Sequence, residues 1–586
     1  MPLIGTAGHV DHGKSTLIQR LTGRDPDRWA EEKRRGLTID LGFAWTIFPD
    51  GTEVSFVDVP GHERYLKNML AGIEAIDMAL FVVAADEGWM PQSEEHLAVL
   101  DLLAVDTGVV AVTKADVVDP DLLELAQIEV SERLEGTSLE SAPILPVSGV
   151  TGQGIERLTD EIQRLLSNLD PRDVGRPRLW VDRSFSASGS GTVVTGTLLD
   201  GQLSLDQAVH IYPRDSSARV RGIQSHETTL SEANPGRRVA LNVAGVDRNE
   251  VGRGDMVGLE GQWETTNRLS ARVMPARYVD EIDRRGAYQL HIGSSVHGME
   301  ITGLEGDVAV IQTTDRFPAT WGDRFIIRDT GRQLVVGGGR VLDPEPGATR
   351  IALKAGLDEL VTNTDPDQMA SALLSSRRSY DVDRLSAHTL GGKARKGKVI
   401  GETVFSRDEI ERLTASARSL VAAEHDQYPL RIGLGLATLA NTLGVEISVA
   451  ETIVDWDSNL VRHGPDIAVT GRTVELDATS ENAWEETRGI LAASLSVPSV
   501  GDLDLNTEIL HLKIRAGELF SISDDLVFLP TQIDQLKKTL GAMSGEFTVA
   551  DYRDATGLSR KYVVPILEWA DREGLTVRRG DTRQVR

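Results

Sequence analysis

A glycine-rich loop close to the N-terminus holds the residues most suited to chemistry. Residues 8–15 read Gly-His-Val-Asp-His-Gly-Lys-Ser and match the pattern Gly-x-x-x-x-Gly-Lys-Ser. Its glycines let backbone N–H groups approach phosphate oxygens, and a helix beginning there favours negative charge. Lys14 can reach the β- and γ-phosphates of a nucleotide, and the Ser15 hydroxyl can bind Mg²⁺. The other phosphate-binding residues that we expect are Asp11, His12, Gly13 and Thr16.

Two further motifs could complete a metal site beside this loop. Residues 58–61 read Asp-Val-Pro-Gly after a strand, which places Asp58 beside the metal and the Gly61 amide near the γ-phosphate. Upstream, Thr38 ends an Arg-Gly-Leu-Thr stretch and its hydroxyl could close over Mg²⁺. The predicted Mg²⁺ ligands are therefore Ser15, Thr38 and Asp58.

The choice of base is predicted from residues 113–116, which read Thr-Lys-Ala-Asp at the end of a strand. The Asp116 carboxylate can accept hydrogen bonds from both N1 and N2 of guanine, and adenine has no such pair of donors. This pattern predicts GTP and GDP rather than ATP. A backbone N–H after the last strand can also reach the guanine oxygen. The expected guanine-binding residues are Thr113, Lys114, Asp116, Ser148 and Gly149.

Positioning these motifs requires a sheet whose loops meet at one edge. Residues 1–170 alternate helix-period stretches with short apolar strands, which predicts a parallel sheet covered on both faces. From residue 179 to about 341 the chain is rich in β-branched residues and punctuated by glycine. No long helical pattern interrupts that region, so two β-barrels are expected. The predicted strands of the first domain are residues 3–6, 53–57, 78–83, 109–112 and 144–147.

Beyond residue 350 the pattern is mostly helical. Residues 443–464 and 557–581 resemble each other, each with a glycine turn, a helix and a small hairpin, the layout of a winged helix. The predicted fold is multidomain: an α/β P-loop GTPase domain, two β-barrels and then mostly α winged-helix modules, about four. The predicted boundaries are 1–172, 175–262, 266–346 and 350–586, with the last module at about 540–586.

Composition narrows the class of protein. The chain has 586 residues, 40% of them hydrophobic, which is ordinary for a globular protein, and it has no cysteine for disulfides or thiolate metal sites. No apolar run approaches the roughly 18 residues of a membrane helix, and no export signal is visible, so we expect a cytoplasmic protein without membrane contact. Because the net charge is −27, any RNA contact must come from local basic patches.

The motifs resemble those of the translational GTPases, of which Gly-His-Val-Asp-His-Gly-Lys and Asp-Val-Pro-Gly-His are distinctive. The resemblance implies that His62 positions the water that hydrolyses GTP. It also implies that Val10 and Leu37 form a hydrophobic gate, which keeps this histidine away until the ribosome docks. The sequence departs from the group at Thr113, where asparagine is usual. We expect the shorter hydroxyl side chain still to brace the phosphate loop, with weaker nucleotide affinity or faster exchange.

Other stretches resemble the selenocysteine-specific elongation factors, chiefly residues 35–43, 191–197, 337–344 and 559–562. The resemblance implies a monomer that carries selenocysteyl-tRNA to the ribosome, at UGA codons marked by an mRNA hairpin. A selenol is an anion at pH 7 whereas the seryl precursor is neutral, so a selective pocket should contain cations. The resemblance assigns this pocket to Arg183 and Arg238, with Phe43 and Asp182 beside them.

The end of the chain is locally basic. Residues 558–586 hold seven basic and four acidic residues, and the resemblance makes this module the reader of the mRNA hairpin, where arginines clamp phosphates and one or two read an extruded base. A second basic cluster, at residues 393–398, could face tRNA or ribosomal RNA. The predicted mRNA-binding residues are Arg560, Lys561, Arg578, Arg579 and Arg583.

Two other classes of function stay open at this point. One is a general elongation factor or an initiation factor that carries a different tRNA, although the helical extension of 236 residues, 351–586, counts against both. The other is a regulatory GTPase outside translation, which would use winged helices to bind nucleic acid or protein. The two barrels and His62 disfavour this second class.

Overall fold

The computed structural model describes residues 2–26, 38, 40–60, 68–70, 75–169, 172–187, 191–346 and 365–586. The chain divides into two compact units, Met1–Arg407 and Asp408–Arg586, and each is described by itself. Three predicted site residues, Leu37, Gly61 and His62, lie outside the described residues.

The first unit begins with a six-stranded sheet in the order β2-β3-β1-β4-β5-β6. Five strands run parallel, and β2 pairs antiparallel with β3 at one edge. The carboxyl ends of the parallel strands therefore meet at one edge, which is where ligands bind in such sheets. The strands are β1 (Leu3–Ala7), β2 (Gly42–Ile47), β3 (Glu53–Asp58), β4 (Met78–Ala84), β5 (Gly108–Thr113) and β6 (Ile144–Pro146).

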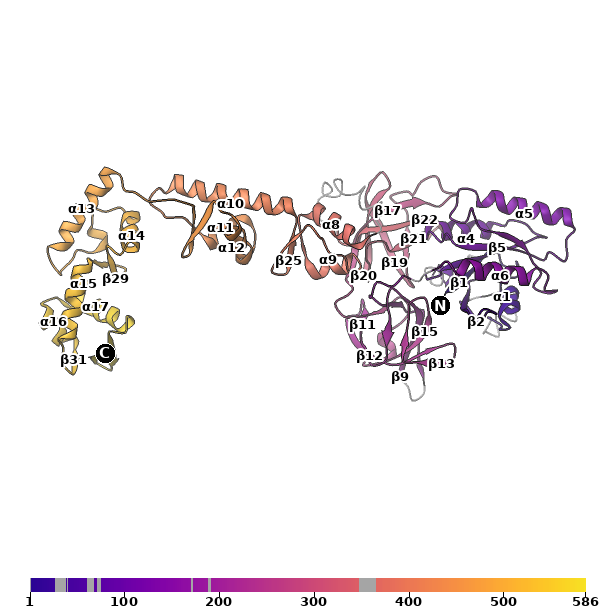
Figure 1. The fold of residues 1–586 in the computed structure, drawn as a ribbon, viewed down its shortest axis with the longest axis horizontal. Helices are drawn as coiled ribbons and strands as arrows, with labels where there is room; N and C mark the ends of the chain where they lie inside the picture. Colours follow the sequence, from indigo (N-terminus) through magenta and orange to yellow (C-terminus); the bar gives the residue numbers. More distant parts are fainter. Residues whose placement is uncertain are drawn as a thin grey trace. The chain divides into compact units, whose positions relative to one another are not determined.

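Helices cover both faces of this sheet (Figure 1). On one face α1 (Lys14–Thr22) and α6 (Ile155–Leu166) pack on strand residues such as Phe56. On the other face lie α4 (Pro91–Leu102) and α5 (Pro120–Leu134). All seven residues of β4 are buried as a result. The predicted parallel sheet between two helical layers is confirmed.

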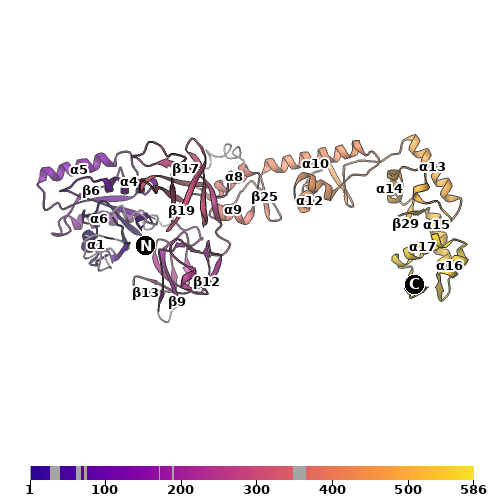
Figure 2. The same ribbon diagram turned by 180° about the vertical axis from the view of Figure 1, so that it is seen from behind.

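Two barrels follow. In Figure 2 the first, which contains β9 and β12, lies below the second, which contains β17 and β19. In the first, β11 pairs with both β16 and β12, which closes a ring of six strands, β11-β16-β7-β9-β15-β12. The second is a closed barrel in the order β17-β20-β19-β18-β21-β22. Both predicted barrels are therefore confirmed. The ring strands are β7 (Arg178–Trp180), β9 (Gly191–Leu199), β11 (Ala208–Tyr212), β12 (Ser216–Ser225), β15 (Arg238–Ala244) and β16 (Met256–Gly258), and those of the second barrel are β17 (Thr265–Pro275), β18 (Tyr288–Ile292), β19 (Ser295–Glu305), β20 (Val308–Pro318), β21 (Arg324–Asp329) and β22 (Leu334–Asp343).

Short elements extend the first barrel. Strand β8 (Arg183–Ala187) pairs with β9, and β13 (Thr228–Leu230) forms a hairpin with β12. The pair β10 (Leu203–Ser204) and β14 (Glu232–Ala233) and the 3₁₀ helix η2 (Arg248–Glu250) complete it. A buried ion network joins the two barrels: Arg178 lies 2.6 Å from Asp200 and 2.7 Å from Asp323. Burying these charges is tolerable only because each is paired.

A small helical module ends the first unit and packs on the second barrel. It comprises α8 (Pro366–Arg377), β23 (Ser379–Asp381), α9 (Val382–His388), β24 (Lys398–Ile400) and β25 (Thr403–Phe405). Trp321 and Leu342 of the barrel share its hydrophobic core with Met369 and Leu373. Arg377 is also ion-paired with Asp343, 2.7 Å away.

The second unit repeats the arrangement of helices and a small hairpin three times. The first repeat contains α10 (Arg407–Gln427, which starts at the last residue of the first unit), β26 (Leu434–Gly435), α11 (Leu436–Leu443), α12 (Ile447–Trp456), β27 (Leu460–His463) and β28 (Asp466–Val469). The next contains α13 (Ala478–Ala492), η3 (Val500–Asp502), α14 (Thr507–Arg515), β29 (Phe520–Ser523) and β30 (Leu526–Phe528). The last contains α15 (Pro530–Gly541), β31 (Glu546–Thr548), α16 (Val549–Thr556), α17 (Arg560–Arg572), β32 (Thr576–Arg579) and β33 (Thr582–Val585).

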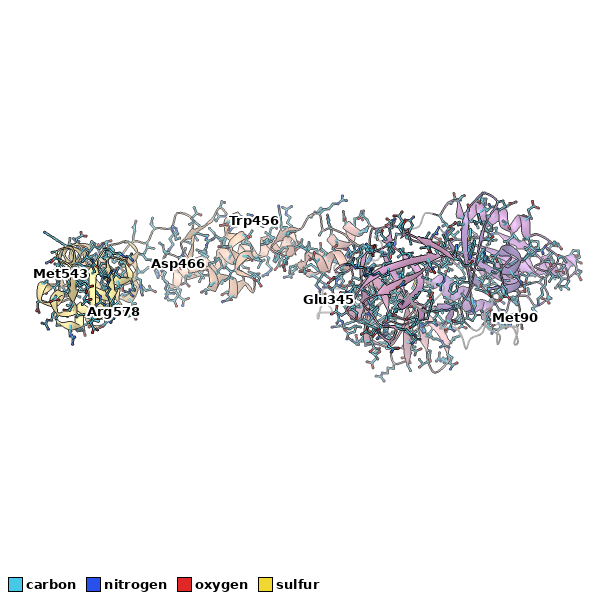
Figure 3. The ribbon with its side chains drawn as sticks, turned by 90° about the horizontal axis from the view of Figure 1, so that it is seen from below. Met90, Glu345, Trp456, Asp466, Met543 and Arg578 are labelled. Carbon is cyan, nitrogen blue, oxygen red and sulfur yellow. The ribbon has the colours of Figure 1, made fainter. Side chains whose placement is uncertain are left out.

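The predicted winged-helix character of the C-terminal region is thus confirmed. The sequence did not predict how its last two repeats pack. The last two repeats share a single hydrophobic core, in which Trp484 and Phe528 pack with Phe547 and Trp569. Figure 3 labels Trp456 and Asp466 in the first repeat of this unit and Arg578 in the last. Across the described residues, no helix combines the length and the apolar character needed to cross a membrane.

Candidate nucleotide and aminoacyl sites

The glycine-rich loop joins β1 to α1, as the motif requires. Asp11 and Gly13 have positive φ angles of 65° and 84°, so the loop curls tightly before the helix begins. A Cβ at Gly8 would overlap the carbonyl oxygen of Val82, which explains glycine there. The Lys14 ammonium crosses the loop and donates to the carbonyl oxygens of Gly8, at 3.0 Å, and His9, at 2.6 Å. It is therefore held where a bound phosphate chain would meet it.

The three predicted Mg²⁺ ligands lie together. The Ser15 hydroxyl donates to Asp58 Oδ2 at 2.7 Å, and the Thr38 hydroxyl lies 3.2 Å from that of Ser15 and 3.3 Å from Asp58 Oδ2. Thr6 donates to the other carboxylate oxygen at 2.7 Å. Burial raises the pKa of the Asp58 carboxyl, so its charged form needs a compensating cation. Hydroxyl and carboxylate oxygens are donors that fit Mg²⁺.

The side chain of Thr113 reaches the phosphate loop. Its hydroxyl donates to the carbonyl oxygen of His12 at 2.7 Å, so the shorter residue does make the bracing contact. Lys114 is paired with Asp86 and Glu87, at 3.0 and 2.8 Å. Asp116 is exposed at the same end of β5, which leaves its carboxylate open to a base.

The second predicted guanine loop lies beside α1. Ser148 is buried, and its hydroxyl accepts a hydrogen bond from the Thr151 N–H at 3.0 Å. A Cβ added at Gly149 would lie 3.2 Å from the methyl group of Thr16. The predicted phosphate and guanine residues that the structure describes therefore surround one end of the sheet.

Two residues that hold the loop were missed from the sequence. From α4, His96 Nδ1 accepts the Gly8 N–H at 3.0 Å and Gln92 Oε1 accepts the Val10 N–H at 3.1 Å. Burial lowers the pKa of His96 well below its ordinary value and that of His12 to about 4. Both rings are therefore neutral at pH 7 and act as structural supports. No motif marks either residue of α4, because only the fold brings that helix to the loop.

The four predicted residues of the aminoacyl pocket come together where β2 faces the first barrel. The guanidinium carbon of Arg238 lies 3.5 Å from the centroid of the Phe43 ring, and that of Arg183 lies 5.5 Å from it. Arg238 is ion-paired with Asp182, which also accepts the Thr195 hydroxyl at 2.6 Å. The sequence could not show this convergence, because Arg183 and Arg238 lie on different strands.

A pocket of about 310 Å³ extends beyond these arginines and is lined also by Trp45, Phe185 and His226. The Trp45 and His226 rings stack with their centroids 4.8 Å apart. The Ser55 hydroxyl lies 3.0 Å from His226 Nε2. Burial lowers the pKa of His226 to about 4, so the ring is neutral. Sequence reasoning missed these residues because His226 sits in a hairpin turn far along the chain from Trp45.

At the C-terminus, four of the five predicted RNA-binding cations are exposed: Arg560, Lys561, Arg578 and Arg579. Arg583 differs, because it is only 5% exposed and its Nε donates to Asp571 at 2.9 Å. Its side chain joins β33 to α17, so the guanidinium that was expected to meet RNA is already paired with a carboxylate. A pattern of basic residues alone cannot distinguish a buried ion pair from a free surface charge.

Family models match three parts of the chain. Residues 1–168 match the elongation factor Tu GTP binding domain, residues 191–258 match elongation factor Tu domain 2, and residues 539–585 match the elongation factor SelB winged helix. The first and last of these matches contain the nucleotide site and the exposed C-terminal arginines.

Relatives match over the full length. The chain is 34% identical to the selenocysteine-specific elongation factor of Desulfomicrobium baculatum, with 100% of both chains covered. It is 30% identical to that of Escherichia coli, covering 100% of this chain and 98% of the relative. This chain belongs to the selenocysteine-specific elongation factor family. The factor also resembles a crystal structure of bacterial selenocysteine-specific elongation factor EF-Sec, with 29% identity, a TM-score of 0.75 and coverage of 100% and 99%.

Proposed function

We propose that the factor delivers selenocysteyl-tRNA to the ribosome at UGA codons marked by a selenocysteine insertion hairpin in the mRNA, and hydrolyses GTP there. The observation that carries the proposal is the convergence of Arg183 and Arg238 on Phe43. A selenolate is an anion at pH 7, and two guanidinium groups beside an apolar ring favour it over a neutral seryl group.

The neighbouring carboxylates do not use all of the N–H donors of these two arginines. Arg238 donates to Asp182 through two of its nitrogens, and Arg183 Nη2 donates to Asp40 and to the carbonyl of Leu41. A guanidinium has five N–H donors in a fixed fork. The remaining donors are available to the selenolate, while the acidic partners fix the orientation of each fork.

The nucleotide site supports GTP hydrolysis with Mg²⁺. Ser15, Thr38 and Asp58 would hold the ion, which neutralises charge on the β- and γ-phosphates when bound. Lys14 would neutralise the same phosphates from the other side of the loop, and Asp116 would select guanine. His62 would hold the attacking water in line, behind a gate formed by Val10 and Leu37.

The C-terminal region is proposed to bind the mRNA. The C-terminal module would bind the mRNA hairpin through Arg560, Lys561, Arg578 and Arg579, phosphates supplying affinity and extruded bases supplying specificity. We propose that the factor acts as a monomer in the cytoplasm, where the ribosome is its partner. The proposed division is 1–172, 175–262, 266–346 and 350–586, with the last module from about 540.

Reconstituted translation tests the proposal. A reporter mRNA with an in-frame UGA followed by the cognate hairpin is translated with selenocysteyl-tRNA, with and without the factor. Full-length product that depends on the factor, on GTP and on the hairpin is expected. Equal readthrough from a reporter that lacks the hairpin would instead favour a general elongation factor.

A further inference from the structure

A cluster of cations lies in the small module at the end of the first unit. Lys393, Arg395, Lys396 and Lys398 are all exposed within six residues, between α9 and β24 and at the start of β24. We propose that this cluster, residues 393–398, binds the backbone phosphates of the tRNA that the same unit carries. The inference rests on the proposed function, since it names a second surface for the same cargo.

The chain just before the cluster is fixed to the first barrel. Leu390 is buried against residues of that barrel and of the segment that follows it. Arg176, which precedes the first strand of the barrel, donates to the Ser386 hydroxyl at 3.1 Å. The cluster therefore begins three residues after a side chain that is locked beside the barrel holding the aminoacyl pocket. The residues around Leu390 are Trp180, Tyr212, Met256 and Trp263.

The same module is also fixed to the second barrel. The N–H of Trp321 donates to the carbonyl oxygen of His388 at 2.9 Å, and the Thr320 hydroxyl lies at the same distance from that oxygen. Because both barrels hold the module, residues 393–398 belong to the compact unit Met1–Arg407. The position of the cluster relative to the two barrels is therefore set within this unit.

The charges in the cluster are available to a partner. Arg395 is 2.8 Å from Asp367, but within the described residues Lys393, Lys396 and Lys398 have no carboxylate within ion-pair distance. In the next repeat, by contrast, Arg412, Arg418 and Arg431 are each paired, with Glu409, Asp457 and Glu424. Unpaired like charges this close together create a local positive potential on a chain whose net charge is −27.

The excess of basic residues ends at the boundary of the small module. Residues 365–407 carry eight Lys and Arg against five Asp and Glu, whereas residues 408–541 carry ten against 22. The two repeats that directly follow the module would therefore repel a polyanion, and the cluster is a bounded patch. Lysine ammonium groups are compact point charges that suit phosphates rather than base edges, so this contact would add affinity and little sequence specificity.

A structural role explains only part of the cluster. Strand β24 is an edge strand in the order β23-β25-β24, and a lysine on an edge discourages pairing with other chains. Lys398 lies in β24, but the other three cations precede it. The edge therefore does not account for Lys393, Arg395 or Lys396.

Two charge-reversed variants of the full chain test the proposal. One is Lys393→Glu with Lys396→Glu. The matched control is Lys537→Glu with Lys538→Glu, two exposed lysines of α15. Affinity of the GTP-bound factor for selenocysteyl-tRNA is measured by filter binding over a range of salt. The first variant should bind at least about tenfold more weakly at 0.1 M salt, with the slope of log K against log salt reduced by about 2; the control should match the wild type.

Wild-type-like affinity and slope in the first variant would overturn the proposal. If ribosome-stimulated GTP hydrolysis fell at the same time, the cluster would belong to a ribosomal RNA contact; if not, it would be a solvated loop. Failure of the wild-type factor to bind any aminoacyl-tRNA would instead overturn the proposed function, so the two failures are distinguishable.

Discussion

Phe43 on β2 lies directly against Arg238 on the first barrel, with 3.5 Å between the ring centroid and the guanidinium carbon. In the β2–β3 pair Phe43 is opposite Val57, and the preceding residue, Gly42, is opposite Asp58. One two-stranded ribbon therefore carries both the aromatic wall of the aminoacyl pocket and the carboxylate of the metal site.

Replacing Arg238 with alanine should weaken the binding of selenocysteyl-tRNA selectively. Loss of a charge-assisted contact costs about 1.5–3 kcal/mol, or roughly tenfold to a hundredfold in affinity. GTP affinity should stay unchanged. Arg221→Ala, which removes an exposed arginine of β12 in the same barrel, is the control for filter binding. Equal losses in the two variants would show that the effect is not specific to the pocket.

Replacing Thr113 with valine should speed the release of GDP. The variant keeps the shape of the side chain but leaves the His12 carbonyl without the hydroxyl that donates to it at 2.7 Å. A neutral hydrogen bond contributes about 1 kcal/mol, so GDP should bind roughly fivefold more weakly. Stopped-flow release of a fluorescent GDP measures this. Thr107→Val is the control, because that hydroxyl lies just before β5 and donates to Asp106 rather than to the loop. Identical release rates would mean that the hydroxyl does not brace the loop.

The sequence predicted the parts of the nucleotide site that lie within short motifs, and it could not predict those that arise from packing. Ser15, Asp58 and Thr113 occupy fixed places after strands, so their type and order were informative. His96 and Gln92 contact the loop from α4, and no motif or spacing in the sequence predicts that contact. Likewise, Arg560 and Arg583 are both basic residues in one segment, but only the folded hairpin places Arg583 against Asp571.

Reversing the charge of Arg578 and Arg579 should abolish most binding of the mRNA hairpin, with tRNA and GTP binding intact. Both side chains are exposed on β32, where they can meet phosphates. Substitution is the sharper test here, because truncation near residue 540 would expose the core that the last two repeats share. Arg488→Glu with Arg553→Glu, two exposed arginines of α13 and α16, serves as the control in gel shifts. Retention of the hairpin by the Arg578 and Arg579 variant would place the reader elsewhere.

Mild acid should destabilise the first unit through His291. Burial lowers the pKa of His291 in β18 to about 3, below the ordinary value of 6.5. Its contribution to stability is therefore complete above pH 6.5 and is lost as the pH falls towards 3. Between pH 7 and pH 5 the expected loss is about 2 kcal/mol. His291→Leu should remove this part of the pH dependence in urea titrations of the full chain, and an unchanged pH dependence would contradict the assignment.

The pocket at Arg183 and Arg238 is proposed to recognise the selenolate. Filter binding of the GTP-bound factor to selenocysteyl-tRNA and to seryl-tRNA, with both amino acids on the same tRNA, tests this most directly. The two ligands differ only in one side-chain atom, which is a charged selenium in one and a neutral hydroxyl oxygen in the other. Affinity for the selenocysteyl form should be higher by at least tenfold, the equivalent of about 1.4 kcal/mol. Equal affinity for the two forms would contradict recognition of the selenolate by this pocket.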